Sequence, residues 1–93
     1  MSWYVYMLRC VDGSLYTGCT DNVARRLAVH QSGRGAKYTR SRLPVELVYQ
    51  EIVADRSAAL KREAAMKRLT RQEKLTLISA FVEMEETEKK VSK

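Results

Sequence analysis

Residues 3–19 carry the sequence WYVYMLRCVDGSLYTGC, which decides the fold. Aromatic and β-branched side chains dominate residues 3–10 and return at 15–18, which is typical of two short strands. Asp12-Gly13-Ser14 lies between them and combines residue types that favour a tight turn. The segment therefore predicts a β-hairpin.

The length of the turn decides whether the two tyrosines of this hairpin can act together. A turn of Asp12-Gly13 alone would place Tyr6 and Tyr16 on opposite faces of the sheet. A loop of Asp12-Gly13-Ser14 would place both on one face, because a shift of one residue in strand register turns every side chain over. Both turns suit the sequence, so a joint role for the tyrosines requires the longer, odd-numbered loop.

The remainder of the chain predicts one further strand and three helices. Thr20 or Asp21 can cap a helix that runs to about Gln31, and a loop rich in Gly, Arg and Lys follows it. Three elements complete the order ββαβαα: a strand at Val45–Val53, a helix capped by Asp55 or Ser57 that ends near Arg68, and a helix that begins at the capping box Thr70-Arg71-Gln72-Glu73. This order predicts an α+β fold, in which helices flank a small three-stranded sheet, mixed or antiparallel.

The chain of 93 residues suffices for one domain, which we place at 1–82, and the charged stretch 83–93 is expected to form a flexible tail. No apolar run is long enough to cross a membrane, and the first residues lack a signal-peptide pattern. The two cysteines, Cys10 and Cys19, are too few for a disulfide framework. We therefore expect packed, reduced thiols and a cytoplasmic protein.

The net charge of +6 is unevenly distributed along the chain. Residues 25–42 contain six basic side chains and no acidic one, whereas the last eleven residues contain four glutamates. A basic surface of this kind attracts polyanions and suits contacts with phosphate groups. Charge alone also fits an ordinary solvated surface, so it indicates nucleic-acid binding without establishing it.

Several polar side chains fall on faces that a simple core would fill with apolar residues. Arg26 and His30 are neighbours on one face of the first predicted helix; the first suits a phosphate and the second can exchange a proton near neutral pH. Glu63 lies on the apolar side of the second helix, where a carboxylate needs a divalent cation, Arg26 or Lys67 as its partner. The structural alternatives are a helix cap or packed ring for the histidine, an ion pair for the glutamate, and core packing for the hairpin tyrosines.

Taken together, these residues resemble the GIY-YIG nucleases. Tyr4-Val5-Tyr6 followed by Tyr16-Thr17-Gly18 is similar to the paired motifs after which the family is named. Arg26, His30 and Glu63 follow in the order and at the spacing of the family's later site residues.

The resemblance extends over about residues 3–82, and it is strongest to the small stand-alone bacterial members of the family, of which the stretch 35–39 is also typical. Tyr4 replaces the glycine of the first motif and Thr17 the isoleucine of the second. The family's late asparagine has no counterpart, because the single asparagine here is Asn22.

The resemblance implies a divalent-metal-dependent endonuclease that hydrolyses DNA phosphodiester bonds, selective for structure rather than sequence, with a role in DNA repair or processing. It implies one Mg²⁺ or Mn²⁺ ion held by Glu63, charge stabilisation by Arg26, and a general base drawn from Tyr6, Tyr16 and His30. DNA is the expected partner, with RNA as an alternative, and neither a membrane nor a small-molecule cofactor is implied. The residues it assigns to nucleic-acid contact are Gly18, Arg25, Arg34, Lys37, Tyr38, Arg40 and Arg42.

Two other classes of function fit parts of the sequence. A non-catalytic nucleic-acid-binding module would use the basic loop alone and bind without divalent metal, although such a module has no need of an inward glutamate. A protein-interaction domain would dock a partner through the strand at Trp3 and Tyr4 and the charged tail, with little salt-dependent affinity for nucleic acid.

Overall fold

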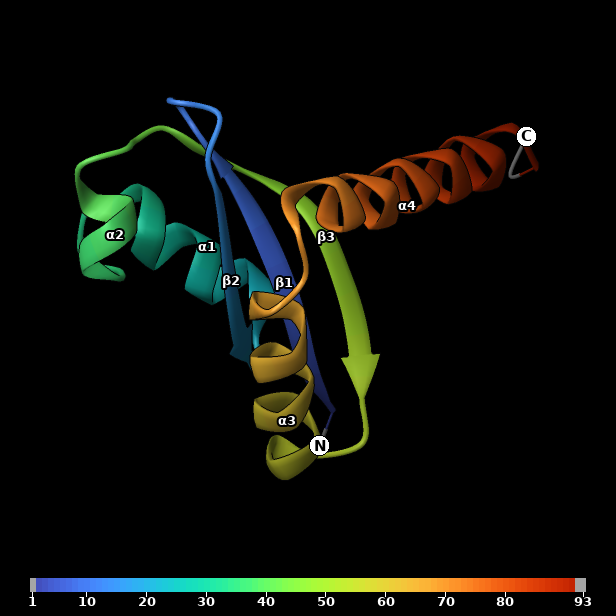
Figure 1. Ribbon diagram of the computed structural model, residues 1–93, viewed down its shortest axis with the longest axis horizontal. Coiled ribbons are helices and arrows are strands. Elements are labelled where there is room, and N and C mark those ends of the chain that lie inside the picture. Colours follow the sequence, from blue (N-terminus) through green and yellow to red (C-terminus); the bar gives the residue numbers. More distant parts are fainter. Residues whose placement is uncertain (1, 92–93) are drawn as a thin grey trace.

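The computed structural model describes the backbone of residues 2–91. Side-chain burial is described for residues 2–85. Figure 1 shows one sheet with helices on both of its sides. The elements in chain order are β1 (Trp3–Cys10), β2 (Leu15–Thr20), α1 (Val23–Gln31), α2 (Lys37–Arg40), β3 (Val45–Val53), α3 (Arg56–Lys67) and α4 (Arg71–Val91). Among residues 2–91, none of the helices combines the length and apolarity needed to cross a bilayer.

The sheet has three strands in the order β2-β1-β3. Both outer strands run antiparallel to β1, so the predicted α+β fold is confirmed and the sheet is antiparallel rather than mixed. Helices α1 and α2 lie on one side of it and α3 and α4 on the other (Figure 1). The short helix α2 occupies part of the segment expected to be a loop. Because β2 is an edge strand, side chains from both faces of the sheet can meet along its outer side.

The hairpin register places the two tyrosines on one face, as their joint role requires. Tyr6 is paired with Gly18, and Leu8 with Tyr16, so these four residues share a face. The loop is odd-numbered as required but begins one residue earlier than expected, because the amide of Cys10 donates to the carbonyl of Ser14 and closes it.

The loop is therefore Val11-Asp12-Gly13, and its backbone explains the shift. The amide of Gly13 donates to the carbonyl of Cys10 at 2.9 Å, and Gly13 has φ +83°, a left-handed conformation suited to glycine. Ser14 follows the loop and is not part of it. Its amide donates to the carboxylate of Asp12 at 3.0 Å, and this hydrogen bond stabilises the end of the turn.

The two faces of β1 supply two separate cores. The face toward α3 and α4 builds a buried cluster of Val5, Met7, Val48, Ala59, Met66 and Ile78. The face toward α1 builds a second cluster of Tyr6, Leu8, Cys10 and Val45, against which Leu27 of α1 packs. Neither cysteine is in a disulfide, since Cys10 is a buried free thiol and Cys19 a half-buried one.

The helix starts are set by side-chain caps. Asn22, rather than Thr20 or Asp21, caps α1, because its side-chain oxygen accepts from the amide of Arg25 at 3.0 Å. Of the two caps predicted for α3, Asp55 and Ser57, the structure has Asp55. The predicted capping box of α4 is confirmed as well, since Thr70 and Glu73 bond each other's backbone amides through their side chains.

Helix α4 differs from the expectation at its far end. The flexible tail was expected from residue 83, but the helix continues without a break to Val91. Its distal part projects past the sheet (Figure 1), so it extends away from the packed body of the molecule.

Replacing Gly13 tests the turn on which the tyrosine register depends. An added Cβ meets nothing within 4 Å, so Gly13→Ala introduces backbone strain alone and should lower the free energy of unfolding by about 1–2 kcal/mol. Gly13→Asn is the matched control and should lose less, because asparagine tolerates the left-handed region. Urea unfolding measures both, and equal stability of Gly13→Ala and the parent would contradict the turn geometry.

Candidate functional site

A fully buried imidazole lies at the centre of the α1 side of the sheet. His30 of α1 is 0% exposed, and its Nε2 lies 2.9 Å from the hydroxyl of Tyr6 on β1. Its Nδ1 lies 2.9 Å from the hydroxyl of Thr39 on α2. The Thr39 hydroxyl donates its only hydrogen to the carbonyl of Ala36 at 3.0 Å, so it accepts from Nδ1–H. In the neutral ring this arrangement leaves Nε2 to accept a hydrogen bond from the Tyr6 hydroxyl.

Burial keeps both members of this pair uncharged at neutral pH. Desolvation, and then the nearby charge of Arg26, lower the pKa of His30 below its usual range. Desolvation raises the pKa of Tyr6 to about 12, and a hydrogen bond to Arg26 opposes that rise. Tyr6, which is 2% exposed, is therefore a buried phenol rather than a ready phenolate.

Two glycines make room for this buried pair. A Cβ on Gly18 would lie 2.6 Å from the hydroxyl oxygen of Tyr6, so the Tyr6 ring occupies the space that a side chain would fill. A Cβ on Gly35 would likewise overlap Nδ1 and Cα of His30. Gly18 was expected to admit a nucleic-acid backbone; the structure shows instead that it is buried beneath Tyr6.

Tyr16 is the tyrosine that faces outward. It is half-buried, and its ring centre lies 5.2 Å from that of His30 in an edge-to-face arrangement. Its ring also stacks with that of Tyr38 of α2 at 6.2 Å. Tyr16 and Tyr38 line a pocket of about 170 Å³ that also includes Lys67, so Tyr16 is open to a ligand where Tyr6 is not.

Glu63 lies on the other face of the sheet from the tyrosines. Its carboxylate accepts from the thiol of Cys19 at 3.3 Å and forms an ion pair with Lys67 at 3.1 Å. The structural alternative of a lysine partner is thus present. The structure brings together Tyr6, Tyr16, Arg26 and His30. Glu63 lies apart from them, and its link to this group is its ion-pair partner Lys67, which lines the pocket beside Tyr16.

The residues around Glu63 fit a divalent cation only in a limited sense. Among the described residues no three His, Cys, Asp or Glu side chains gather into a complete ligand set. Mg²⁺ commonly uses one or two carboxylates together with water and substrate phosphate oxygens. The Glu63 carboxylate, with its side chain 18% exposed, can supply that one protein ligand if Lys67 moves aside. An ion held this way would depend on the substrate for much of its coordination.

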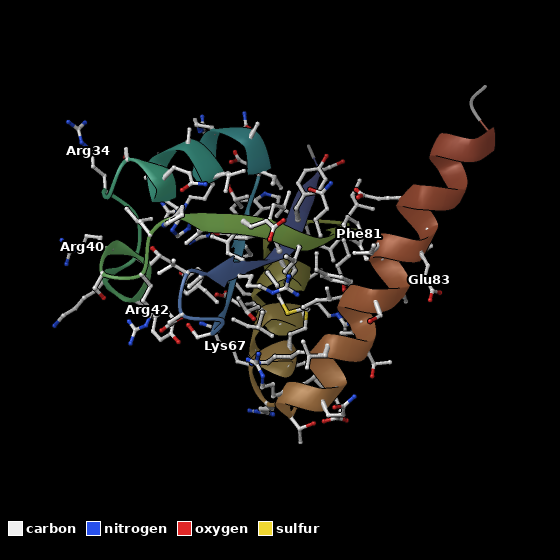
Figure 2. All side chains as sticks on the ribbon, turned by 90° about the horizontal axis from the view of Figure 1, so that it is seen from above. Arg34, Arg40, Arg42, Lys67, Phe81 and Glu83 are labelled. Carbon is white, nitrogen blue, oxygen red and sulfur yellow. The ribbon has the colours of Figure 1, made fainter. Side chains whose placement is uncertain are left out.

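The basic residues of the α1–α2 segment divide into two groups. Figure 2 shows Arg34, Arg40 and Arg42 gathered at the end of the molecule away from α4, with Arg34 and Arg40 pointing outward. Arg42 is already engaged: it pairs with Asp12 at 3.1 Å, and its guanidinium lies 3.9 Å from the centre of the Tyr38 ring.

Arg25 is engaged as well, because it pairs with Asp21 at 3.1 Å. Arg34, Lys37 and Arg40 are exposed and form no ion pair within residues 2–85. Of the predicted phosphate contacts, these three are therefore the ones free to meet a polyanion, while Arg42 instead ties α2 to the hairpin loop.

Sequence reasoning missed Thr39 and Gly35, which hold His30, and Lys67 as a pocket residue. A threonine in a basic, glycine-rich segment carries no signal of burial, yet Thr39 is 0% exposed. Its position within the stretch 35–39, which resembles the family, was the one available indication.

The tautomer of His30 can be observed directly, because the chain contains a single histidine. Imidazole ¹⁵N NMR at pH 7 should show a protonated Nδ1 and an unprotonated Nε2, and Thr39→Val should shift the population away from this form.

The same histidine should make stability depend on pH. Since the pKa of His30 is lower in the folded protein, the contribution of the neutral imidazole to the free energy of unfolding is present above pH 6.5 and is lost as pH falls toward the folded pKa. A charged imidazole or a dominant Nε2–H tautomer at pH 7 would contradict the hydrogen-bond assignment.

Comparisons with known proteins show the family to which the chain belongs. The model of the GIY-YIG catalytic domain matches residues 2–76. A UPF0213 protein of Desulfotalea psychrophila is 55% identical over 80 residues, which cover 85% of this chain and 73% of that protein. One from Staphylococcus haemolyticus is 53% identical over 75 residues, 81% of this chain and 92% of the relative. The solution NMR structure of an E. faecalis protein is 47% identical in sequence and superposes with a TM-score of 0.59. The match covers 87% of this chain and 86% of the E. faecalis chain. The chain belongs to the GIY-YIG family.

Proposed function

We propose that this protein is a metal-dependent endonuclease that hydrolyses DNA phosphodiester bonds. The observation that carries the proposal is the position of Tyr16: its ring rests on the buried His30 and borders a pocket. Arg26 lies beside Tyr6 on the face of the sheet toward α1, and Glu63 lies on the opposite face, toward α3. A phosphate at the edge of β2 could thus meet a phenol, a guanidinium and a carboxylate together.

Tyr16 is the better candidate for the general base, a choice that the sequence left open. Tyr6 is 2% exposed, has a pKa of about 12, and donates its hydroxyl to His30, so it cannot reach an attacking water. Tyr16 would first release its phenolic proton to solvent; the phenolate would then take a proton from the attacking water while the water oxygen bonds to phosphorus. The bond from phosphorus to the leaving oxygen breaks, and that oxygen is protonated by solvent.

The buried residues hold this arrangement rather than react. Tyr6, His30 and Thr39 form one hydrogen-bonded chain from β1 through α1 to α2. Because His30 stays neutral, it adds no positive charge that would compete with Arg26 for the phosphate. Arg26, half-buried next to the pair, can neutralise the charge that develops on the phosphate oxygens.

Glu63 supplies negative charge on the far side of the scissile phosphate. The chemistry that a bound Mg²⁺ or Mn²⁺ ion provides is polarisation of the phosphoryl group and stabilisation of the leaving oxygen. Glu63 would hold the ion, and the Cys19 thiol, which donates to Oε1, orients the carboxylate. Burial and then that hydrogen bond raise the pKa of Cys19 to about 11, so the thiol remains a donor at neutral pH.

The surface supports a sequence-independent mode of binding. The exposed side chains of Arg34, Lys37 and Arg40 can contact phosphates. Such contacts position a nucleic-acid strand without reading its bases. We therefore propose selectivity for DNA structure rather than sequence, in repair or processing, with RNA as an alternative substrate. A panel of DNA and RNA forms incubated with Mg²⁺, Mn²⁺ or EDTA tests this directly. Absence of metal-dependent cleavage of every form would refute the nuclease function and leave the two non-catalytic alternatives, the nucleic-acid-binding module and the protein-interaction domain.

Glu63→Gln separates chemistry from folding. It keeps the shape of the side chain and removes the charge needed to hold a cation, so cleavage should fall by orders of magnitude while DNA binding persists. Lys67, whose side chain is 56% exposed, would be left in solvent, so the free energy of unfolding should change by no more than about 0.5 kcal/mol. Cleavage, fluorescence anisotropy and thermal melting measure the three quantities. A variant that cuts as fast as its parent would refute the role of Glu63.

The basic surface predicts a specific salt dependence. Replacing Arg34, Lys37 and Arg40 together by alanine should flatten the log–log plot of DNA affinity against salt, by about 0.7–0.9 for each phosphate that is no longer neutralised. Lys61→Ala is the control, because Lys61 is an exposed lysine of α3 outside this surface. If the triple variant shows the slope of the Lys61→Ala protein, the assignment of this surface is wrong.

A further inference from the structure

The pocket beside Tyr16 contains residues that the proposed reaction does not use. It has a volume of about 170 Å³ and is lined by Leu15, Tyr16, Thr17, Tyr38, Lys67 and Lys74. These residues come from β2, α2, α3 and α4, so the pocket lies where the two helical layers meet around the outer edge of the sheet. In Figure 2, Lys67 lies between Arg42, which follows α2, and the start of α4.

The charge of the lining suits an anion. Lys67 and Lys74 are the only ionised side chains among the lining residues, and no carboxylate lines the pocket. Lys74 is half-buried and forms no ion pair within residues 2–85, so its charge has no partner there. Lys67 pairs with Glu63 at 3.1 Å, but its side chain is 56% exposed and long enough to turn toward the pocket.

Thr17 gives an independent indication of a ligand. Thr17 is one of the residues that line the pocket, and it is 4% exposed. Among the described residues, its Oγ1 is the single buried side-chain oxygen or nitrogen without a hydrogen-bond partner. Buried hydroxyls are nearly always satisfied by protein or by an ordered group. An oxygen atom of a ligand or a water in the pocket could complete it after a rotation of the Thr17 side chain toward the pocket.

The size and walls of the pocket narrow the class of ligand. A volume of about 170 Å³ is that of roughly five or six waters, which suits a tetrahedral phosphate rather than a whole peptide. The stacked rings of Tyr16 and Tyr38 add an apolar wall that fits the sugar or base attached to such a phosphate. Two ammonium groups, a free hydroxyl and two aromatic rings together match one nucleotide.

We propose that this pocket binds a nucleotide phosphate next to the scissile one, with Lys74 as its fixed cation and Lys67 as a cation that leaves Glu63 to reach it. The inference rests on the proposed function, because it treats Glu63 as the ligand of a divalent cation. In the free protein Lys67 neutralises Glu63. When a phosphate draws Lys67 into the pocket, Glu63 is released for the cation.

This exchange makes the two binding events help each other. A divalent cation must displace Lys67 from Glu63, and a phosphate must attract the same ammonium, so each ligand removes an obstacle to the other. Thermodynamic linkage requires the effect to be equal in both directions. Metal affinity in the absence of nucleotide should therefore be weak and should rise when the pocket is filled.

Thymidine 3′,5′-bisphosphate is a suitable probe, because it carries two phosphates but no phosphodiester bond to cut. Its affinity for the full chain is measured with and without Mn²⁺, and Mn²⁺ affinity is measured by electron paramagnetic resonance with and without the probe. Glu63→Gln corrects for Mn²⁺ bound by the nucleotide alone. Lys67→Met and Lys74→Met are compared with Lys61→Met, an exposed lysine of α3 that does not line the pocket.

The parent and Lys61→Met should show mutual tightening of Mn²⁺ and probe by roughly 5-fold or more. Lys67→Met should bind Mn²⁺ more tightly without the probe and should lose the mutual effect. Lys74→Met should weaken the probe several-fold and leave Mn²⁺ affinity unchanged. Lys74→Met behaving as Lys61→Met, or Lys67→Met retaining the coupling, would overturn the proposal. DNA cleavage by the parent, assayed in parallel, shows separately whether the nuclease function itself holds.

Discussion

The imidazole of His30 is a fully buried polar group whose two nitrogens are bonded by different elements. Tyr6 approaches it from the central strand, Thr39 from α2, and the ring itself belongs to α1. Leaving either nitrogen without a partner would cost about 1–3 kcal/mol, so the three elements are fixed relative to one another by the same side chain. Tyr16 rests on this ring, and its orientation toward solvent therefore depends on the buried hydrogen bonds beneath it.

The edge position of β2 explains how one site can draw on both faces of the sheet. Tyr16 and Gly18 point toward α1, while Thr17 and Cys19 point toward α3, where Cys19 meets Glu63. A central strand would separate these side chains by a neighbouring strand, but along a free edge a phosphate can reach both. In the proposed mechanism, a phosphate at this edge would meet Arg26 from one face of the sheet and Glu63, with its partner Lys67, from the other.

Sequence reasoning predicted the elements well where local signals decide them. The bounds of β3 and the capping box at Thr70 were predicted from local residue types and capping chemistry. The shared face of Tyr6 and Tyr16 was left open, because both turns suited the sequence. The loop position depended on which residue adopts positive φ, and both candidate turns contain Gly13. The burial of Thr39 and the placement of Glu63 across β2 arise from contacts between distant segments, which no local pattern encodes.

The division of labour between the two tyrosines is tested most directly by comparing DNA cleavage rates of Tyr16→Phe and Tyr6→Phe in the presence of Mn²⁺. If Tyr16 is the general base, Tyr16→Phe should cut roughly 10²–10⁴-fold more slowly than the parent while keeping its stability. Tyr6→Phe should retain more activity than Tyr16→Phe but lose about 1–3 kcal/mol of unfolding free energy, because His30 Nε2 is left without its donor. Cleavage by Tyr16→Phe at the rate of the parent, or a greater loss of activity in a fully stable Tyr6→Phe, would contradict this account.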